Sequence, residues 1–229
     1  MKVLRALGFL VTTVAMYLGI PLLGWGLGDL RGFFSLGQRL GYALLVAVLG
    51  LAVGWQALAS PGGIRGGKGR EDKLVARQRV IRIAVILLMY LALLFLPFAD
   101  RRGIGTLAGH ALLRWIGAST FGLGMGIVFW SGVALGKLYS GDVTLQEDHR
   151  LVTSGPYRHL RHPRYTGAIL IGFGLSLTFN SWIGLVGSVV FIGIVLFRIR
   201  DEEALMREAF GQEWDEYCER TPRLIPLLY

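Results

Sequence analysis

The chain has 229 residues, of which 53% are hydrophobic and only 17% are charged, and its mean hydropathy is +0.54. Soluble domains carry about a quarter charged residues, so this composition excludes an ordinary soluble fold and indicates a membrane protein. The net charge of +9 does not indicate nucleic-acid binding, because the basic residues lie beside apolar segments, where anionic membrane lipids are the simpler partner. The single cysteine, Cys218, excludes an internal disulfide framework.

Four segments predict full transmembrane helices, each of which needs about 20 mostly apolar residues. These segments are Leu7–Leu27, Leu40–Ala59, Val80–Phe98 and Ala111–Leu135. Glycines in and after the fourth segment have small-xxx-small spacing, which predicts close helix packing: Gly122, Gly124, Gly126, Gly132 and Gly136. We assign residues 1–135 to an N-terminal domain of transmembrane helices and residues 136–229 to a second domain.

A polar segment, Gly136–Arg164, separates these spans from two shorter apolar stretches, Tyr165–Phe179 and Trp182–Phe197. Only Asn180 and Ser181 lie between the two stretches, which predicts a tight helical hairpin. The first arm is short, so its length leaves open whether the hairpin crosses the membrane fully. The predicted fold class is all-α: a polytopic membrane helix bundle with about four full spans and a C-terminal helical hairpin.

Basic residues in the loops indicate the orientation, because loops rich in Lys and Arg stay cytoplasmic. The loop between the second and third spans is the most basic, with Arg65, Lys68, Arg70, Lys73, Arg77, Arg79 and Arg82. Of the two loops on the opposite side, one carries Arg31 and Arg39 and the other carries Arg101, Arg102 and Arg114. This distribution predicts cytoplasmic N- and C-termini, so that Gly136–Arg164 and Arg198–Tyr229 meet at one membrane face.

The densest polar run, His149–Gly167, combines histidines, arginines and tyrosines with two prolines. Pro156 and Pro163 fix the backbone and favour a shaped loop over a solvated helix. Loops that gather aromatic and hydrogen-bonding side chains are typical of small-molecule sites. We predict no metal site, because Pro163 disfavours the helix that would align His159 with His162, and no cysteine is near.

A second polar block, Arg198–Leu205, follows the last apolar stretch. By composition alone it is a positive-inside anchor and a charged helix start. Beyond it, apolar residues recur at helical spacing and predict a face that lies on the membrane or covers a pocket: Met206, Phe210, Trp214 and Tyr217. We expect Gly211 to break or bend this helix, and the proline-flanked tail Thr221–Pro226 to fold back over the site.

Together the two blocks resemble the isoprenylcysteine carboxyl methyltransferase and phospholipid methyltransferase superfamily. The resemblance covers about Asp142 to Pro226 and rests on Leu151–Tyr157, Arg161-His162-Pro163-x-Tyr165-x-Gly167, Glu202-Glu203 and Phe210-Gly211-x-x-Trp214-x-x-Tyr217. It implies a membrane methyltransferase that uses S-adenosylmethionine, releases S-adenosylhomocysteine and has no Rossmann domain. Asp142 stands where eukaryotic members have a cofactor-binding glutamine.

The resemblance also implies roles for individual residues. The cofactor site would comprise His149, Leu151, Val152, Tyr157, His162, Pro163, Tyr165 and Glu202. Arg198 would face the methyl acceptor, and Arg161 is a second candidate catalytic residue, because either guanidinium can hold an anionic group. The acceptor would be lipid-like or amphiphilic, such as a prenylcysteine carboxylate or a lipid amine. Its identity and the oligomeric state stay open.

A non-catalytic membrane protein is the alternative. A transporter or assembly factor would bind lipid or a partner through the same basic cytoplasmic face. Transport favours ionisable residues inside the spans, whereas Gln56 is the main polar residue within the predicted ones. The sequence therefore favours the enzyme.

Overall fold

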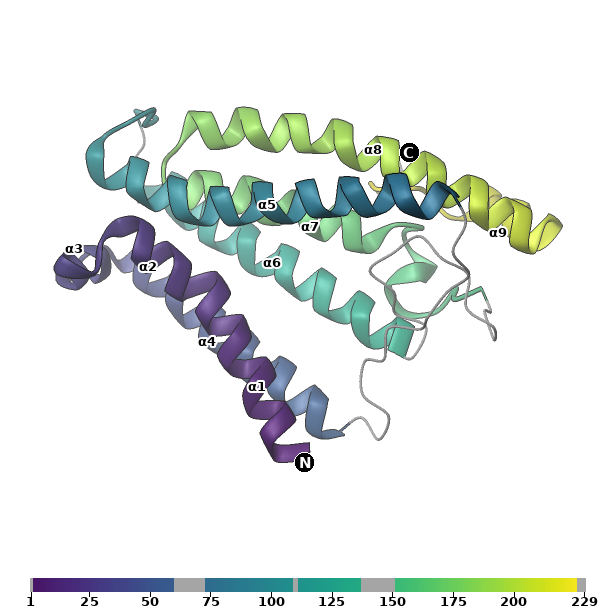
Figure 1. Ribbon diagram of the computed structural model, residues 1–229, viewed down its shortest axis with the longest axis horizontal. Helices are drawn as coiled ribbons and strands as arrows, with labels where there is room; N and C mark the ends of the chain where they lie inside the picture. The colour runs from purple at the N-terminus through teal and green to yellow at the C-terminus, as the bar shows by residue number, and fades with distance from the viewer. Residues whose placement is uncertain (1, 60–72, 109–110, 137–150, 226–229) are drawn as a thin grey trace.

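The computed structural model describes residues 2–59, 73–108, 111–136 and 151–225, and in these ranges it is a helix bundle without β-strands (Figure 1). The helices are α1 (Lys2–Val14), α2 (Ile20–Trp25), α3 (Leu30–Phe34), α4 (Gly37–Ala59), α5 (Lys73–Arg102), α6 (Ala111–Leu135), α7 (Pro163–Thr178), α8 (Trp182–Phe210) and α9 (Gln212–Arg220). The predicted all-α class is confirmed.

Five helical segments of the described chain are long and apolar enough to cross a membrane, judged by length and composition. They are Val3–Trp25, Gly37–Ala59, Gln78–Arg102, Ala111–Leu135 and Trp182–Phe210. The four predicted spans are among them, and the protein is a multi-pass membrane protein. The first span includes a π-helical turn, Ala15–Gly19, just before Pro21, whose ring and missing N–H disturb regular α-helical hydrogen bonding.

Helices α6 and α7 lie side by side because glycines let their backbones touch. A Cβ atom added at Gly124 would lie 2.6 Å from the carbonyl oxygen of Gly167, and one at Gly174 would lie 2.4 Å from the backbone nitrogen of Phe121. Gly124 therefore packs as its spacing predicts. Gly126 does not, since a Cβ there would meet nothing within 4 Å.

The predicted hairpin forms with a tight turn between α7 and α8. Asn180 adopts a positive φ of 53°, and its side-chain amide donates to the carbonyl of Leu107 at 2.9 Å. Ser181 caps α8 by accepting from the backbone N–H of Gly184 at 3.1 Å. Unlike the predicted second arm, α8 does not end at Phe197 but runs for 29 residues to Phe210. The second polar block therefore belongs to the same continuous helix.

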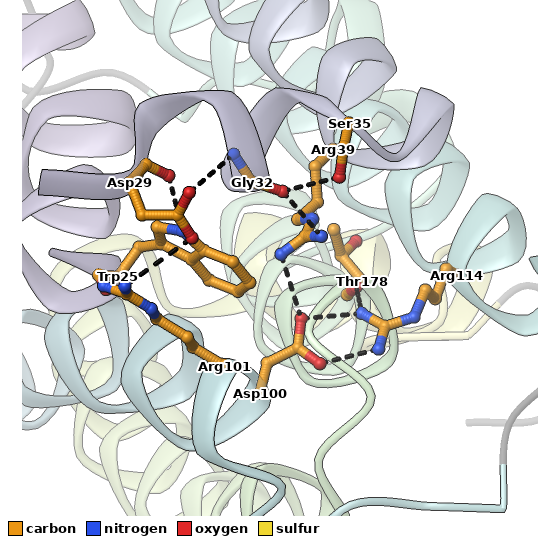
Figure 2. A network of polar contacts seen from close by, with 9 residues as sticks. All are labelled: Trp25, Asp29, Gly32, Ser35, Arg39, Asp100, Arg101, Arg114 and Thr178. Atoms are coloured by element: carbon orange, nitrogen blue, oxygen red, sulfur yellow. Dashed lines mark hydrogen bonds and ion pairs between the residues drawn. The ribbon is translucent and has the colours of Figure 1, made fainter. Parts of the chain in front are cut away.

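A buried ionic network joins the helices at the end of the bundle where α5 and α7 finish (Figure 2). Arg114 donates to both carboxylate oxygens of Asp100, at 2.6 and 2.8 Å, and to the carbonyl of Thr178 at 2.9 Å. Arg39 lies 3.8 Å from Asp100, and both side chains are at most 5% exposed. The Arg39 guanidinium also stacks 4.0 Å from the ring centre of Trp25. We call this the Asp100 end.

The sequence analysis counted Arg39 and Arg114 among the loop charges, although Arg114 falls inside the predicted span Ala111–Leu135. In the structure both are helix residues, because α4 begins at Gly37 and α6 at Ala111. Their burial against Asp100 is the main difference from the predicted topology.

Candidate functional site

The two polar blocks meet at the opposite end of α7. Pro163 is the first residue of α7 and His162 is its N-cap. A proline suits the first helical position, because the N–H that it lacks would have no partner within the helix there. The preceding chain makes a 3₁₀ turn, Gly155–Arg158, in which Gly155 has a φ of 62°. The predicted shaped loop is therefore observed for the described part of the run.

Tyr165 links the loop to α8. Its hydroxyl donates to Oε2 of Glu202 at 2.9 Å and accepts from Nε of Arg198 at 3.2 Å. Arg198 and Glu202 are four residues apart and so share one helix face. Arg198 is 8% exposed, whereas Tyr165 and Glu202 are half-buried. Three of the predicted site residues thus form one contact cluster, as the meeting of the two blocks requires.

Glu203 forms a second cluster beside the first. Its Oε1 lies 3.2 Å from Nε2 of His162, and Nε of Arg223 donates to both carboxylate oxygens at 3.0 and 2.9 Å. Nε of Arg161 lies 3.5 Å away. His162 is 4% and Glu203 is 9% exposed. We call this end of the bundle the Glu203 end.

The C-terminal tail folds back along the loop, as predicted. The backbone N–H groups of Arg161 and His162 donate to the carbonyls of Pro222 and Arg223 at 2.8 and 3.0 Å. Thr166 donates its hydroxyl to the carbonyl of Leu224 at 2.8 Å. The tail therefore pairs with the chain that leads into α7.

Helix α9 holds the 3₁₀ turn from the other side. Gly211, with a φ of 53°, separates α9 from α8, so the expected break at this glycine is confirmed. The Tyr217 hydroxyl donates to the carbonyl of Tyr157 at 2.5 Å. Burial raises the pKa of Tyr217 above its usual range, so the hydroxyl stays protonated and keeps its donor role.

The remaining predicted residues occupy different places. Leu151 and Val152 lie half-buried in the irregular chain before the 3₁₀ turn, and Tyr157 lies within it. His149 lies outside the described residues. The two candidate catalytic arginines belong to different clusters, since Arg161 faces Glu203 and Arg198 contacts Tyr165.

Sequence reasoning missed three contributors to this end. Glu203 was part of the recognised glutamate pair but received no role, and Arg223 lies between the two prolines of the tail. Gln78 of α5 donates its amide to the Asp201 carboxylate and is 1% exposed. Only the glutamate pair carried a signal in the sequence, because the other two depend on which helices pack together.

Residues 112–213 match the phospholipid methyltransferase family model. The match covers somewhat less than half of the chain. Protein-S-isoprenylcysteine O-methyltransferase of Schizosaccharomyces pombe is 34% identical over 83 residues, covering 36% of this chain and 35% of the relative. The corresponding protein B of Arabidopsis thaliana is 32% identical over 84 residues, covering 36% and 43%.

A third relative has a different name. The cobalt-zinc-cadmium resistance protein CzcN of Cupriavidus metallidurans is 33% identical over 126 residues, covering 53% of this chain and 57% of the relative. The chain thus spans less than two thirds of the length of each of these three relatives. The resemblance found in the sequence is confirmed, and it lies in the segment that builds the Glu203 end.

Proposed function

We propose that the protein transfers a methyl group from S-adenosylmethionine to a lipid-like or amphiphilic acceptor. The observation that carries the proposal is the contact of Tyr165 with both Glu202 and Arg198. It joins the histidine-proline loop to the glutamate pair within one small volume, inside the segment that matches a methyltransferase family. The proposal includes the predicted domain boundary after residue 135 and a cytoplasmic location for both termini and the Glu203 end.

The chemistry of the side chains fits this cofactor. S-adenosylmethionine carries a sulfonium and an ammonium, which suit a carboxylate and aromatic faces. Glu202 supplies the carboxylate, and the rings of His162 and Tyr165 lie 5.8 Å apart at an angle of 43°. A cation over an aromatic face gains about 0.5–2 kcal/mol, depending on how far it is desolvated. Tyr157 and Pro163 would complete the wall on the loop side.

When bound, the cofactor supplies a methyl group that its sulfonium has already activated. The residues of the chain therefore need only align the two reactants and exclude water. Arg198 is suited to hold an anionic acceptor, because it lies directly after lipid-facing residues: Leu196 and Phe197 are 40% and 41% exposed. An acceptor with an apolar chain would reach Arg198 from the bilayer.

The test is cofactor binding to the intact protein in detergent, measured by calorimetry with S-adenosylhomocysteine. We expect Glu202→Gln and Tyr165→Phe to weaken binding about tenfold, since the first removes the negative charge that attracts the cofactor and the second removes the hydrogen bond that holds Glu202. Arg198→Gln should mainly lower the rate of methyl transfer from labelled S-adenosylmethionine to a membrane lipid extract. Glu208→Gln, on the exposed side of the same helix, is the control and should change neither quantity.

Two results would contradict the proposal. A folded protein that binds neither S-adenosylmethionine nor S-adenosylhomocysteine cannot be this enzyme. A protein that binds the cofactor but labels no component of the extract would favour the non-catalytic alternative. Identification of the labelled lipid in a positive experiment would define the acceptor.

A further inference from the structure

The tail Thr221–Ile225 lies beyond the family match, which ends at residue 213, yet it is built into the Glu203 end. Leu224 is 8% exposed and packs with Val195 and Ile199 of α8. On the other side, the carbonyl of Leu224 accepts from Thr166 of α7 at 2.8 Å. The tail is therefore fixed to both arms of the hairpin, and Arg223 extends from a well-held backbone.

Arg223 reaches His162 by two routes. Its backbone carbonyl accepts from the N–H of His162 at 3.0 Å. Its guanidinium holds the carboxylate of Glu203, with Nη2 2.7 Å from Oε2 and Nε within 3.0 Å of Oε1. The same Oε1 atom lies 3.2 Å from the His162 ring. Charge-assisted hydrogen bonds of this geometry orient a carboxylate. The Arg223 guanidinium therefore determines the position of the Glu203 oxygen that contacts the His162 ring.

We propose that Arg223 is a positioning residue that orients His162 for cofactor binding. The inference rests on the proposed function and deepens it, because it makes cofactor affinity depend on a tail residue outside the family segment. The side chain of Arg223 acts on His162 through the Glu203 carboxylate. Its effect should therefore disappear when the His162 ring is absent.

The experiment measures S-adenosylhomocysteine binding to the full chain by calorimetry, alongside the melting temperature. Arg223→Gln should weaken binding about tenfold, since it removes a charged partner of Glu203. Arg223→Lys should recover part of the loss, because lysine keeps the charge but not the planar fork. Arg220→Gln is the matched control: its side chain is 75% exposed and pairs with Glu216, so binding should not change.

A double-variant cycle separates positioning from general stability. In a His162→Ala background, adding Arg223→Gln should change the Kd by less than about twofold, because coupled residues are not additive. Equal tenfold losses in both backgrounds would overturn the proposal. So would a lowered melting temperature for both Arg223 variants with an unchanged Kd.

The two proposals fail in different ways. If the unaltered protein does not bind S-adenosylhomocysteine, the proposed function fails. If it binds and both Arg223 variants bind equally well, only the role of Arg223 fails. Should Arg223→Gln not fold, Arg223→Lys is compared in the same way with and without the His162 ring, and an equal loss of affinity in both backgrounds would refute positioning.

Discussion

The Asp100 end offers the sharpest test of what holds this bundle together. Two guanidiniums, those of Arg39 and Arg114, share the one carboxylate of Asp100 (Figure 2). The side chain of Asp100 is 4% exposed and that of Arg114 is 14% exposed. The variant Asp100→Asn keeps the size of the side chain but removes the charge, so it leaves two buried cations without a counter-ion.

The loss of stability in Asp100→Asn depends on how deeply its ion pairs are buried. Removing one partner of a buried ion pair costs about 3–5 kcal/mol, whereas an exposed pair contributes about 0–1 kcal/mol. A chain of this length loses roughly 2–4 °C in melting temperature per kcal/mol. Asp100→Asn should therefore lower the melting temperature by roughly 6–20 °C.

Asp29→Asn is the matched control at the same end of the bundle. Asp29 lies 3.6 Å from Arg101, and both side chains are 39% exposed. Asparagine preserves the helix cap that Asp29 provides to Gly32. We expect this variant to melt within a few degrees of the unaltered protein, because its ion pair is largely solvated.

A third variant tests whether the unbalanced charge is the cause. Nε and Nη1 of Arg39 make no hydrogen bond to any described residue. Replacing this side chain in Arg39→Met/Asp100→Asn removes one of the two uncompensated cations, so the double variant should be more stable than Asp100→Asn alone, by on the order of 1–2 kcal/mol. Melting can be followed by far-UV circular dichroism in detergent. A double variant less stable than the single one, or equal melting of Asp100→Asn and Asp29→Asn, would refute the electrostatic explanation.

Two further predictions concern helix packing and the site. Gly124→Ala should destabilise the protein by about 1–3 kcal/mol, because the added Cβ would lie 2.6 Å from the Gly167 carbonyl oxygen. Gly126→Ala is the control: a Cβ there meets nothing within 4 Å, so the melting temperature should stay unchanged or rise slightly. Tyr217→Phe should cost about 0.5–1.5 kcal/mol through loss of the hydrogen bond to Tyr157. Unchanged melting in thermal denaturation would contradict either prediction.

Local signals in the sequence were enough to predict much of this fold. Long apolar runs locate the spans, and the two polar residues at 180 and 181 locate the hairpin turn. The prolines at 156 and 163 identify the loop, because they restrict the backbone whatever lies nearby. These features depend on neighbours in sequence, and the structure has them where the sequence puts them.

What could not be predicted depends on partners that are distant in sequence. Nothing near Arg39 indicates that it pairs with Asp100, 61 positions further along the chain. The tail was expected to fold back, but nothing near Arg223 in the sequence indicates that its guanidinium reaches Glu203 on α8. The extent of α8 was underestimated because Arg198–Ala209 is polar, although its residues are mostly good helix formers and no breaker occurs before Gly211.

On the proposed function, the unequal lengths of the hairpin arms indicate how a water-soluble cofactor and a lipid-borne acceptor would meet. Helix α7 has 16 residues, so it rises about 24 Å, less than the roughly 30 Å of a hydrocarbon core. Arg198 lies sixteen positions after Trp182, the start of α8, and is thus at a similar height, about 24 Å. If the charged Asp100 end lies at one interface, Tyr165 and Arg198 lie just inside the other. The proposed site would then be within reach of the bilayer, while the rest of α8 and the tail would extend into water, from which the cofactor would bind.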